Sequence, residues 1–471
     1  MRSHTYITVM LMGLLLFPLQ PLAAQETPTA ELEFVEYMGY VRKYHPIVRQ
    51  AELRLAQGAA SLMKARGGFD PKIEVDYDRK KFKGTEYWDR LNTTFKIPTW
   101  YGLEFKANFE QNQGAFINPD ETLPEEGLFG AGVKLSLAQG LWINKRMASL
   151  KKARFFREQT RAEQQILVNE VLSEAATAYF DWVRAYQDYQ IFDSFLLNAQ
   201  QRFEGVKQRA IRGDMAMIDT VEAKIAVQNR DLSKEQAWLD LQKAALNLSN
   251  YLWIEDVPVE LQGVVRPAPL SEASVDGSLG LVGLNFEDFN VAEHPKLIAL
   301  QQKVQGLEVE KNLKVNQLLP KIDLEYNFLT PDPNLIGTFD TQQYKGGLSF
   351  RFPLFLRKER GELKLARIKL NDASYERDFA QVSITNKVGA LYAQLESFGR
   401  QQSMIGDMIM NYRTLLQGEE RKFNFGESSL FLINSRESKL IDAELKGNSL
   451  QNKYYVSKIK LFKGLALDAD F

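Results

Sequence analysis

Six stretches of the sequence alternate apolar and polar residues with a period of two, which predicts β-strands with one apolar and one polar face. In the first stretch, Ile73, Val75 and Tyr77 are apolar and the residues between them are charged. The pattern predicts strands over 71–82, 89–97, 102–110 and 129–138 in the first half of the chain, and over 320–329 and 344–353 in the second half.

Two long stretches, 144–212 and 357–424, contain no proline and place apolar residues at steps of three and four, as in the seam of a coiled coil. A helix of this length would extend for about 100 Å at 1.5 Å per residue. Gly213 and Gly426 follow the two stretches, and glycine tolerates the left-handed backbone of a helix stop. In the first stretch the seam comprises Leu172, Ala175, Tyr179, Trp182, Tyr186, Tyr189, Phe192, Leu196, Ala199, Phe203, Val206 and Ala210.

The two halves of the chain repeat one plan. The phrase PKIEVDY at 71–77 recurs as PKIDLEY at 320–326, which is 249 positions later (320 − 71). The pair His45-Pro46 recurs as His294-Pro295 at the same offset (294 − 45 = 249). We infer a tandem duplication, because two separate matches between the halves of the chain have the same offset of 249 residues.

The offset between the repeats falls to 213 by the glycines (426 − 213), so the first repeat has 36 extra residues (249 − 213) between residues 77 and 133. This insertion, about 84–118, contains two of the predicted strands and is interpreted as an added β-hairpin.

Each repeat therefore has the order helix, strands, long helix, return helix. The ranges are as follows: first repeat 25–252, with helices over 31–67, 144–212 and 214–252; connector 253–285, richer in proline and glycine; second repeat 286–471, with helices over 287–318, 357–424 and 427–464.

The N-terminal residues 1–24 have the features of a secretory signal peptide: a basic start, an apolar run and small residues before the expected cleavage site after Ala24. The alternative is a membrane anchor, but the run is short and two prolines interrupt it. No later segment has ~18 consecutive apolar residues, so we expect no transmembrane helix.

The composition of the chain argues against several classes of function. The formal charge of −1 over 471 residues gives no reason to expect nucleic acid as a partner. The absence of cysteine excludes disulfides, thiolate metal sites and a cysteine nucleophile. The three histidines are His4, in the signal peptide, and His45 and His294, whose place before proline indicates helix starts. We expect no enzyme activity, no cofactor and no metal site, since no catalytic motif is present.

Strands with one polar and one apolar face suit a transmembrane barrel, which is apolar outside and wet inside. The strands of one repeat are too few to close, and an open edge is not tolerated in lipid, so repeats and subunits would have to pool strands. The alternative is a soluble sandwich whose core covers the apolar faces. Aromatic residues near the strand ends are candidates for contact with the membrane interface: Trp88, Trp100, Tyr101, Trp142, Tyr344 and Phe355.

The signal peptide, the duplicated plan, the step FPLF at 352–355 into a long helix and the glycine at each helical tip together resemble the TolC-like outer membrane efflux proteins. The resemblance covers essentially the whole mature chain and lies in the order and length of elements. It implies an α+β membrane protein: a trimeric outer-membrane β-barrel continued by a long α-helical coiled-coil barrel in the periplasm.

The function implied by this resemblance is a passive exit duct in the outer membrane, working in a tripartite efflux pump or a type I secretion system. Its implied partners are two further copies of the chain, outer membrane lipid, a periplasmic adaptor (membrane fusion) protein and an inner-membrane pump. The alternative is a periplasmic coiled-coil adaptor or scaffold without a pore. The exported substrate is not indicated by the sequence.

Two features depart from the family pattern. The family's usual subunit gives four strands, whereas this chain predicts six, so a trimer would have eighteen strands if the added hairpin joins the barrel. The alternative is that the hairpin folds over the mouth. At the periplasmic gate, where the family has acidic residues in the second repeat, this chain has Leu432 and Ser435.

In the first repeat, the positions that match Leu432 and Ser435 are Asp219 and Glu222. We predict that these form the acidic gate ring; the alternative is that they are ordinary solvated helix charges. The resemblance also implies that the helical tips contact the adaptor, and the tip residues are Gly213, Asp214, Met215, Gly426, Glu427 and Ser428.

Overall fold

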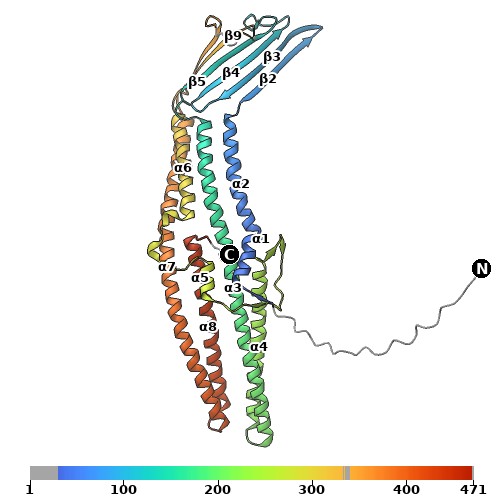
Figure 1. The fold of residues 1–471 in the computed structure, drawn as a ribbon, viewed down its shortest axis with the longest axis vertical. Helices are drawn as coiled ribbons and strands as arrows, with labels where there is room; N and C mark the ends of the chain where they lie inside the picture. Colours follow the sequence, from blue (N-terminus) through green and yellow to red (C-terminus); the bar gives the residue numbers. More distant parts are fainter. Residues whose placement is uncertain (1–29, 333, 335–339, 469–471) are drawn as a thin grey trace, which may run out of the picture.

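The computed structural model describes residues 30–332, 334 and 340–468. The expected signal peptide, including His4, lies outside the described residues. The molecule is elongated, with a β-sheet at one end and long helices that extend from it to two helical tips at the other end (Figure 1). No helix in the described part of the chain is both long and apolar enough to cross a membrane.

One antiparallel sheet contains six strands in the order β10-β9-β5-β4-β3-β2. The two repeats join where β5 pairs with β9. The added hairpin supplies β3 and β4, which lie between β2 and β5, so it widens the sheet and does not fold away from it. The strands are β2 (Lys72–Phe82), β3 (Thr85–Pro98), β4 (Leu103–Gln113), β5 (Leu128–Ala138), β9 (Lys321–Thr330) and β10 (Tyr344–Arg351).

The strand register separates an apolar face from a polar face. Phe105 pairs with Val133, and Val133 pairs in turn with Tyr326, so apolar side chains form rows across three strands. The next residues along, Glu104 and Lys134, pair with each other on the opposite face. Because the side chains of a strand alternate between faces, a register shift of one residue would mix the two faces.

The long helices are similar in both repeats. Both α3 and α7 contain 68 residues. The helices are α1 (Phe34–Tyr44), α2 (Pro46–Arg66), α3 (Lys145–Arg212), α4 (Met217–Ser249), α5 (Glu272–Ser278), α6 (Pro295–Asn316), α7 (Arg357–Asn424) and α8 (Leu430–Leu465).

The helix expected over 31–67 is broken at His45, where the backbone is extended (ψ 132°) and α1 ends. A residue before proline avoids the helical region, and proline suits the first position of the helix that follows. The His45 imidazole also caps α2, since its Nδ1 accepts a hydrogen bond from the Ile47 backbone N–H at 3.3 Å. His294 caps α6 in the same way, accepting from Lys296 N–H at 3.1 Å, so the helix expected from 287 begins at Pro295.

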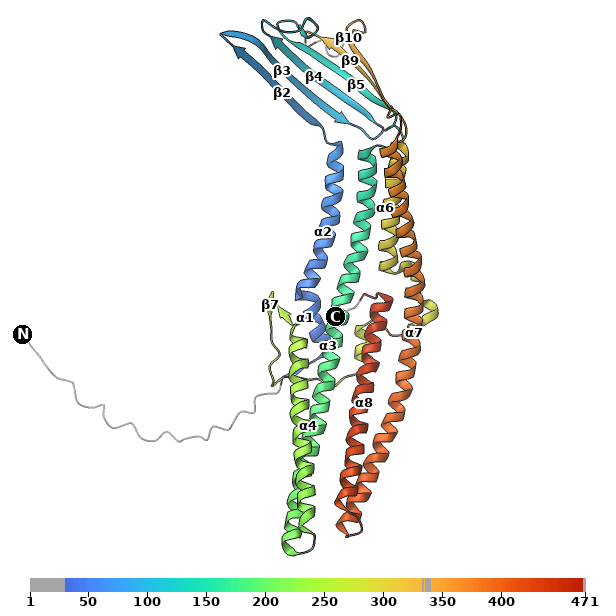
Figure 2. The ribbon, with the colours of Figure 1, turned by 180° about the vertical axis from the view of Figure 1, so that it is seen from behind.

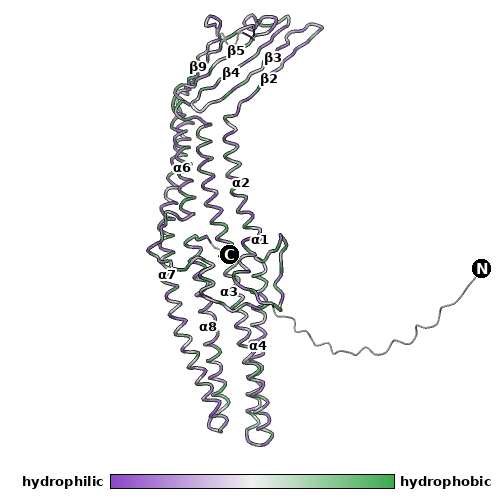
Figure 3. Tube along the Cα trace, in the orientation of Figure 1, coloured by the Kyte–Doolittle hydropathy of each residue, from purple (hydrophilic) through white to green (hydrophobic). Residues whose placement is uncertain are grey.

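The helices form a wall beneath the sheet. Next to the sheet, α2, α3, α6 and α7 lie side by side in that order; farther away, α3 pairs with α4, α7 pairs with α8, and α3 contacts α8 (Figure 2). Apolar and polar residues are mixed along the long helices in Figure 3, as expected for helices with one packed face.

The largest hydrophobic core lies at the middle of the molecule, where α1 and the connector pack on α3, α4 and α8. Tyr37 and Tyr179 are fully buried there, and the Tyr179 hydroxyl donates a hydrogen bond to the Leu32 carbonyl at 2.8 Å. The connector supplies α5 and the short strands β6 (Trp253–Ile254), β7 (Val257–Pro258) and β8 (Arg266–Pro267); β8 pairs with β1 (Glu31–Leu32).

Candidate functional site

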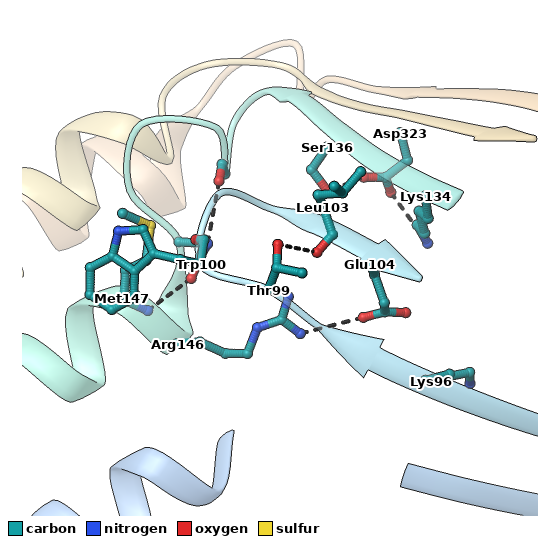
Figure 4. Close-up of polar contacts among 12 residues, drawn as sticks. Lys96, Thr99, Trp100, Leu103, Glu104, Lys134, Ser136, Arg146, Met147 and Asp323 are labelled. Carbon is teal, nitrogen blue, oxygen red and sulfur yellow. Dashed lines mark hydrogen bonds and ion pairs between the residues drawn. The ribbon is translucent and has the colours of Figure 1, made fainter. Parts of the chain in front are cut away.

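The polar face of the sheet carries charges of both signs in close contact. Asp323 on β9 is 4% exposed and accepts a hydrogen bond from the Ser136 hydroxyl at 2.8 Å. Lys134 lies on the neighbouring strand with its Nζ 3.9 Å from the Asp323 carboxylate (Figure 4). Lys321 Nζ lies 3.4 Å from the same carboxylate. A carboxylate held by two ammonium groups and a hydroxyl stays charged, which suits a face that lines water and not lipid.

Cross-strand ion pairs continue along this face. Lys106 Nζ lies 2.8 Å from Glu325, joining β4 to β9 across β5, and Lys96 pairs with Glu74 on the neighbouring strand. Because cations and carboxylates alternate, this part of the face presents no strong excess of one sign.

The sheet is joined to α3 by a set of polar contacts, of which Figure 4 shows the one between Arg146 and Glu104. The Asn144 Oδ1 caps α3 by accepting from the Met147 N–H at 2.8 Å, and its Nδ2 donates to the Trp100 carbonyl in the β3–β4 turn at 3.1 Å. The Arg146 guanidinium lies 3.4 Å from the Glu104 carboxylate of the polar face. Sheet and helices are therefore fixed to each other at the turn.

The predicted interface aromatics divide into two groups. Tyr101, Trp142, Tyr344 and Phe355 are exposed by 56–79%. Trp100 instead packs in the joint, where it stacks on Phe69 with ring centroids 5.6 Å apart. Trp88 lies on the polar side, opposite Lys80 in the register and within 4.7 Å of its ammonium group.

The two lateral flanks of the chain are unpaired. Every residue of the edge strands β2 and β10 is exposed. On the β10 flank, one face of α7 exposes apolar side chains: Leu365, Ile368, Tyr375, Phe379 and Val382. On the β2 flank, α2 exposes Leu53 and Met63.

The two helical tips have the same backbone turn. Gly213 and Gly426 have φ of 84° and 79°, a left-handed conformation that favours glycine. In each turn the next N–H, of Asp214 or Glu427, donates to a carbonyl five residues back at 2.9 Å. Asp214 and Glu427 are exposed at the tips.

The other two predicted tip residues face inward. Met215 packs against the apolar cluster between the coiled coils. The Ser428 hydroxyl donates to the Glu419 carboxylate at 2.5 Å.

Asp219 and Glu222 lie in the first two turns of α4, and both are half-buried. The Glu222 carboxylate accepts a hydrogen bond from the Asn434 amide of α8 at 3.2 Å. Glu222 therefore also links the two coiled coils of one chain, and Asp219 complements the positive end of the α4 dipole. At the matching positions in α8, Leu432 is 37% exposed and Ser435 is half-buried.

A buried ion cluster that was not predicted lies above the tips. Glu437 of α8 is 1% exposed; its carboxylate pairs with Arg202 of α3 and lies 3.4 Å from Arg230 of α4. The signal in the sequence is a carboxylate at a seam position, between the buried Ile433 and Leu440. A buried carboxylate needs such partners, so this cluster ties three helices together.

A second unpredicted cluster fixes the connector to α8. Lys458 is 3% exposed, and its Nζ lies 2.6 Å from Glu272 and 2.7 Å from Asp276 of α5. Burial lowers the pKa of Lys458, but hydrogen bonds to Asp276 and Glu272 outweigh it and raise the pKa above the usual lysine value. Lys458 therefore acts as a charged clamp on the connector.

No group of three or more potential metal-ligating side chains occurs among the described residues. A search of curated protein sequences finds no match. Residues 291–466, most of the second repeat, match the family model described as outer membrane efflux protein.

Solved structures share the fold of nearly the whole chain at low sequence identity. The Campylobacter jejuni CmeC outer membrane channel superposes with a TM-score of 0.65 at 12% identity, covering 92% of this chain and 85% of that one. CusC gives 0.67 at 14% identity, covering 92% and 91%. The Neisseria gonorrhoeae MtrE outer membrane channel, in its open state, gives 0.63 at 13% identity, covering 92% and 88%.

The expected fold class is confirmed by these likenesses, which extend over both repeats. The second repeat thus matches the outer membrane efflux protein family over residues 291–466, and nearly the whole chain shares the fold of the outer membrane channels.

Proposed function

We propose that three copies of this chain close into one exit duct that passively conducts small molecules or proteins out of the periplasm. The observation that carries this proposal is the pair of open flanks, β2 with α2 on one side and β10 with α7 on the other (Figure 2). An unpaired strand edge is not tolerated in lipid, so each flank requires a neighbour.

Strand direction allows the flanks to pair with each other. The six strands are antiparallel throughout, so β2 runs away from the helices and β10 runs back toward them. The β2 edge of one copy can therefore pair antiparallel with the β10 edge of the next. Three copies of six strands give a closed barrel of eighteen, an even number as antiparallel closure requires.

Helical flanks meet under the same symmetry. Where β2 meets β10 of the next copy, α2 meets α7, and the exposed apolar face of α7 would then be covered. Phe379 and Tyr375, exposed by 75% and 72% in the single chain, are the largest side chains on that face. Burial of such side chains supplies a driving force for assembly.

The tips would meet a periplasmic adaptor that connects the duct to an inner-membrane pump, in a tripartite efflux pump or a type I secretion system. Asp214 and Glu427 are the exposed charged residues of the two tip turns, and Gly213 and Gly426 set the turn shape. Met215 and Ser428 would support these turns from inside. Tyr101, Trp142, Tyr344 and Phe355 would contact the membrane interface, since they are exposed near the strand ends.

Asp219 and Glu222 would form the acidic ring at the periplasmic gate, six carboxylates in a trimer. Their test is the conductance of Asp219→Asn/Glu222→Gln channels in planar bilayers, where cation selectivity should fall. The matched control is Asp231→Asn/Glu235→Gln, two exposed carboxylates farther along α4. Equal cation selectivity in the wild type and both variants would contradict an acidic ring at Asp219 and Glu222.

Closure itself is tested by cysteine pairs, because the chain has no cysteine of its own. Val75 of β2 and Leu348 of β10 both belong to the apolar face. With Val75→Cys fixed, a second cysteine is placed at 346, 348 or 350, and in matched controls at 347 or 349 on the polar face. We expect disulfide-linked trimers for at least one of the first set and for neither control. Monomers throughout would contradict closure.

A further inference from the structure

The ends of the helices next to the sheet carry a large excess of positive charge. Residues 143–154, at the start of α3, contain five cations and no carboxylate, and residues 357–369, at the start of α7, contain six cations and two carboxylates. The whole chain has a formal charge of −1, so this excess is local.

The exposed cations of these two segments that have no carboxylate within ion-pair distance in the described part of the chain include Lys151, Arg154, Arg360, Lys364 and Arg367. We call these five the basic collar. Arg360, Lys364 and Arg367 follow one another at steps of four and three, so they lie on one face of α7.

The basic collar is unfavourable within a single chain. Like charges three or four residues apart on a helix repel each other. Arg360, in the first turn of α7, also opposes the positive end of the helix dipole. A compensating anion outside the chain would remove both costs.

The collar faces away from the lumen. Lys145 and Lys152 of α3 line a groove of about 710 Å³ between α2, α3 and α6. Arg146, which also lines the groove, pairs with Glu104 of the polar face of the sheet, so the groove lies on the luminal side. Arg154 lies two residues beyond Lys152, a rotation of about 200° around the helix, and therefore points to the opposite side.

The row on α7 also points away from the lumen. Lys303 lines the groove and pairs with Glu376 of α7 at 2.7 Å, so Glu376 marks the luminal side of α7. Glu362 lies fourteen residues earlier, about four turns, on the same side. Lys364 lies two residues beyond Glu362, so it points outward.

If the sheet spans the membrane, the collar lies at the depth of the lipid headgroups. β10 ends at Arg351 and α7 begins at Arg357, directly below the sheet. The row from Arg360 to Arg367 spans about 11 Å at 1.5 Å per residue, comparable with a headgroup layer of roughly 5–7 Å and a Debye length of about 8 Å. Long Lys and Arg side chains can also extend toward the membrane surface.

We propose that the basic collar binds the phosphate groups of anionic phospholipids in the periplasmic leaflet of the outer membrane. Opposite charge at headgroup depth, next to the apolar face of the sheet, favours this occupant over any other. A trimer would present fifteen such cations on its outer surface, just below the sheet. The proposal rests on the outer membrane location and on the trimer proposed above.

The test compares lipids retained by purified trimers in nanodiscs of equal parts phosphatidylglycerol and phosphatidylcholine, counted by native mass spectrometry. Wild type should retain phosphatidylglycerol preferentially at low salt and lose the preference at high salt. Arg360→Gln/Lys364→Gln/Arg367→Gln should lower the preference at least about five-fold. A second variant, Lys151→Gln/Arg154→Gln, gives an independent reading if the first fails to fold.

The matched control is Lys439→Gln/Lys446→Gln/Lys453→Gln, three exposed lysines on α8 far from the sheet, which should retain the wild-type preference. Equal retention by wild type and both collar variants would overturn the proposal, as would an equal loss in the control. Inorganic phosphate or glycerol phosphate should not replace the lipid; if either displaces phosphatidylglycerol, the site belongs to a soluble anion. Failure of the trimer itself would be seen separately, as monomer mass.

Discussion

The two longest helices, α3 and α7, have equal length but different surroundings. α3 lies inside the wall and is buried along much of its length, whereas α7 lies on a flank and has few buried residues (Figure 2). A duplicated sequence has thus kept two rods of equal length, as a tube of side-by-side helices requires. What each rod buries depends on its place in the wall, and the flank is incomplete in a single chain.

The two repeats differ in their number of strands but not in the length of their long helices. The first repeat supplies four strands and the second supplies two, yet the helices beneath them match in length. Since the added hairpin enters the sheet between β2 and β5, the sheet widens without any change in the helices. Within one chain, the number of strands in the sheet can therefore change while the number of helices beneath it stays the same.

The largest difference between α3 and α7 should appear at Tyr179 and Tyr392, which occupy matching positions (392 − 179 = 213). Tyr179 is fully buried in the central core, whereas Tyr392 is partly buried at the edge of a smaller cluster. Tyr179→Ala should lower the free energy of unfolding by about 3–5 kcal/mol and Tyr392→Ala by roughly half as much. Urea unfolding of the two variants measures both; equal losses would mean that the helices are equivalent.

The buried Glu437 should be the next most sensitive position. Glu437→Gln removes the carboxylate that Arg202 and Arg230 share, which leaves Arg202 with Glu420 alone at 3.5 Å, and should cost about 3 kcal/mol. The control is Glu396→Gln on α7, whose pair with Arg400 is more than half exposed and should change stability by less than about 1 kcal/mol. A loss at Glu396 as large as that at Glu437 would refute the ranking. Thermal unfolding in detergent gives both values.

The open flank of α7 should be sensitive only in the assembly. Phe379→Ser should weaken each contact between neighbouring chains by about 2 kcal/mol, because an aromatic side chain would no longer be buried there. Sedimentation of purified protein over a range of concentrations measures the trimer–monomer equilibrium. Val282→Ser, at a valine 72% exposed on the connector, is the matched control. An unchanged equilibrium for Phe379→Ser would place the interface elsewhere.

The smallest effect should be the pH dependence of the connector clamp. Hydrogen bonds from Lys458 and Tyr454 lower the pKa of Glu272, so its contribution is present above the unfolded pKa and is lost as the pH falls through the folded pKa. The stability difference between wild type and Glu272→Gln should therefore shrink on acidification below about pH 4.5. Melting temperatures of both proteins between neutral and acidic pH measure this difference. A difference that grows on acidification would contradict the prediction.

Much of the fold could be predicted because it depends on period and spacing. Alternation identified all six strands, and the seam and tip glycines defined the long helices, since both follow local geometry. The pair His45-Pro46 indicated a helix start, but the helix predicted over 31–67 still ran through it, because the helical pattern continues on both sides of His45. Whether the added hairpin joins the sheet depends on pairing between distant strands, which the pattern of one strand does not specify.

The site could be predicted less well, because it depends on which faces meet. Trp88 has the residue type of an interface aromatic, but the register places it on the polar face beside Lys80. In the sequence, Glu437 resembles any other charged residue of a helix. Its role depends on Arg202 and Arg230, which two other helices place beside it. Glu222 matched a gate position by spacing alone, and only the structure shows its hydrogen bond to Asn434.

The central claim is that chains with six-stranded sheets close, flank to flank, into one duct. The most direct test is the number of strands around the membrane-embedded part of the purified particle, counted by cryo-electron microscopy. We predict eighteen strands, with β2 of each chain paired to β10 of its neighbour. Twelve strands, or separate sheets with free edges, would contradict it.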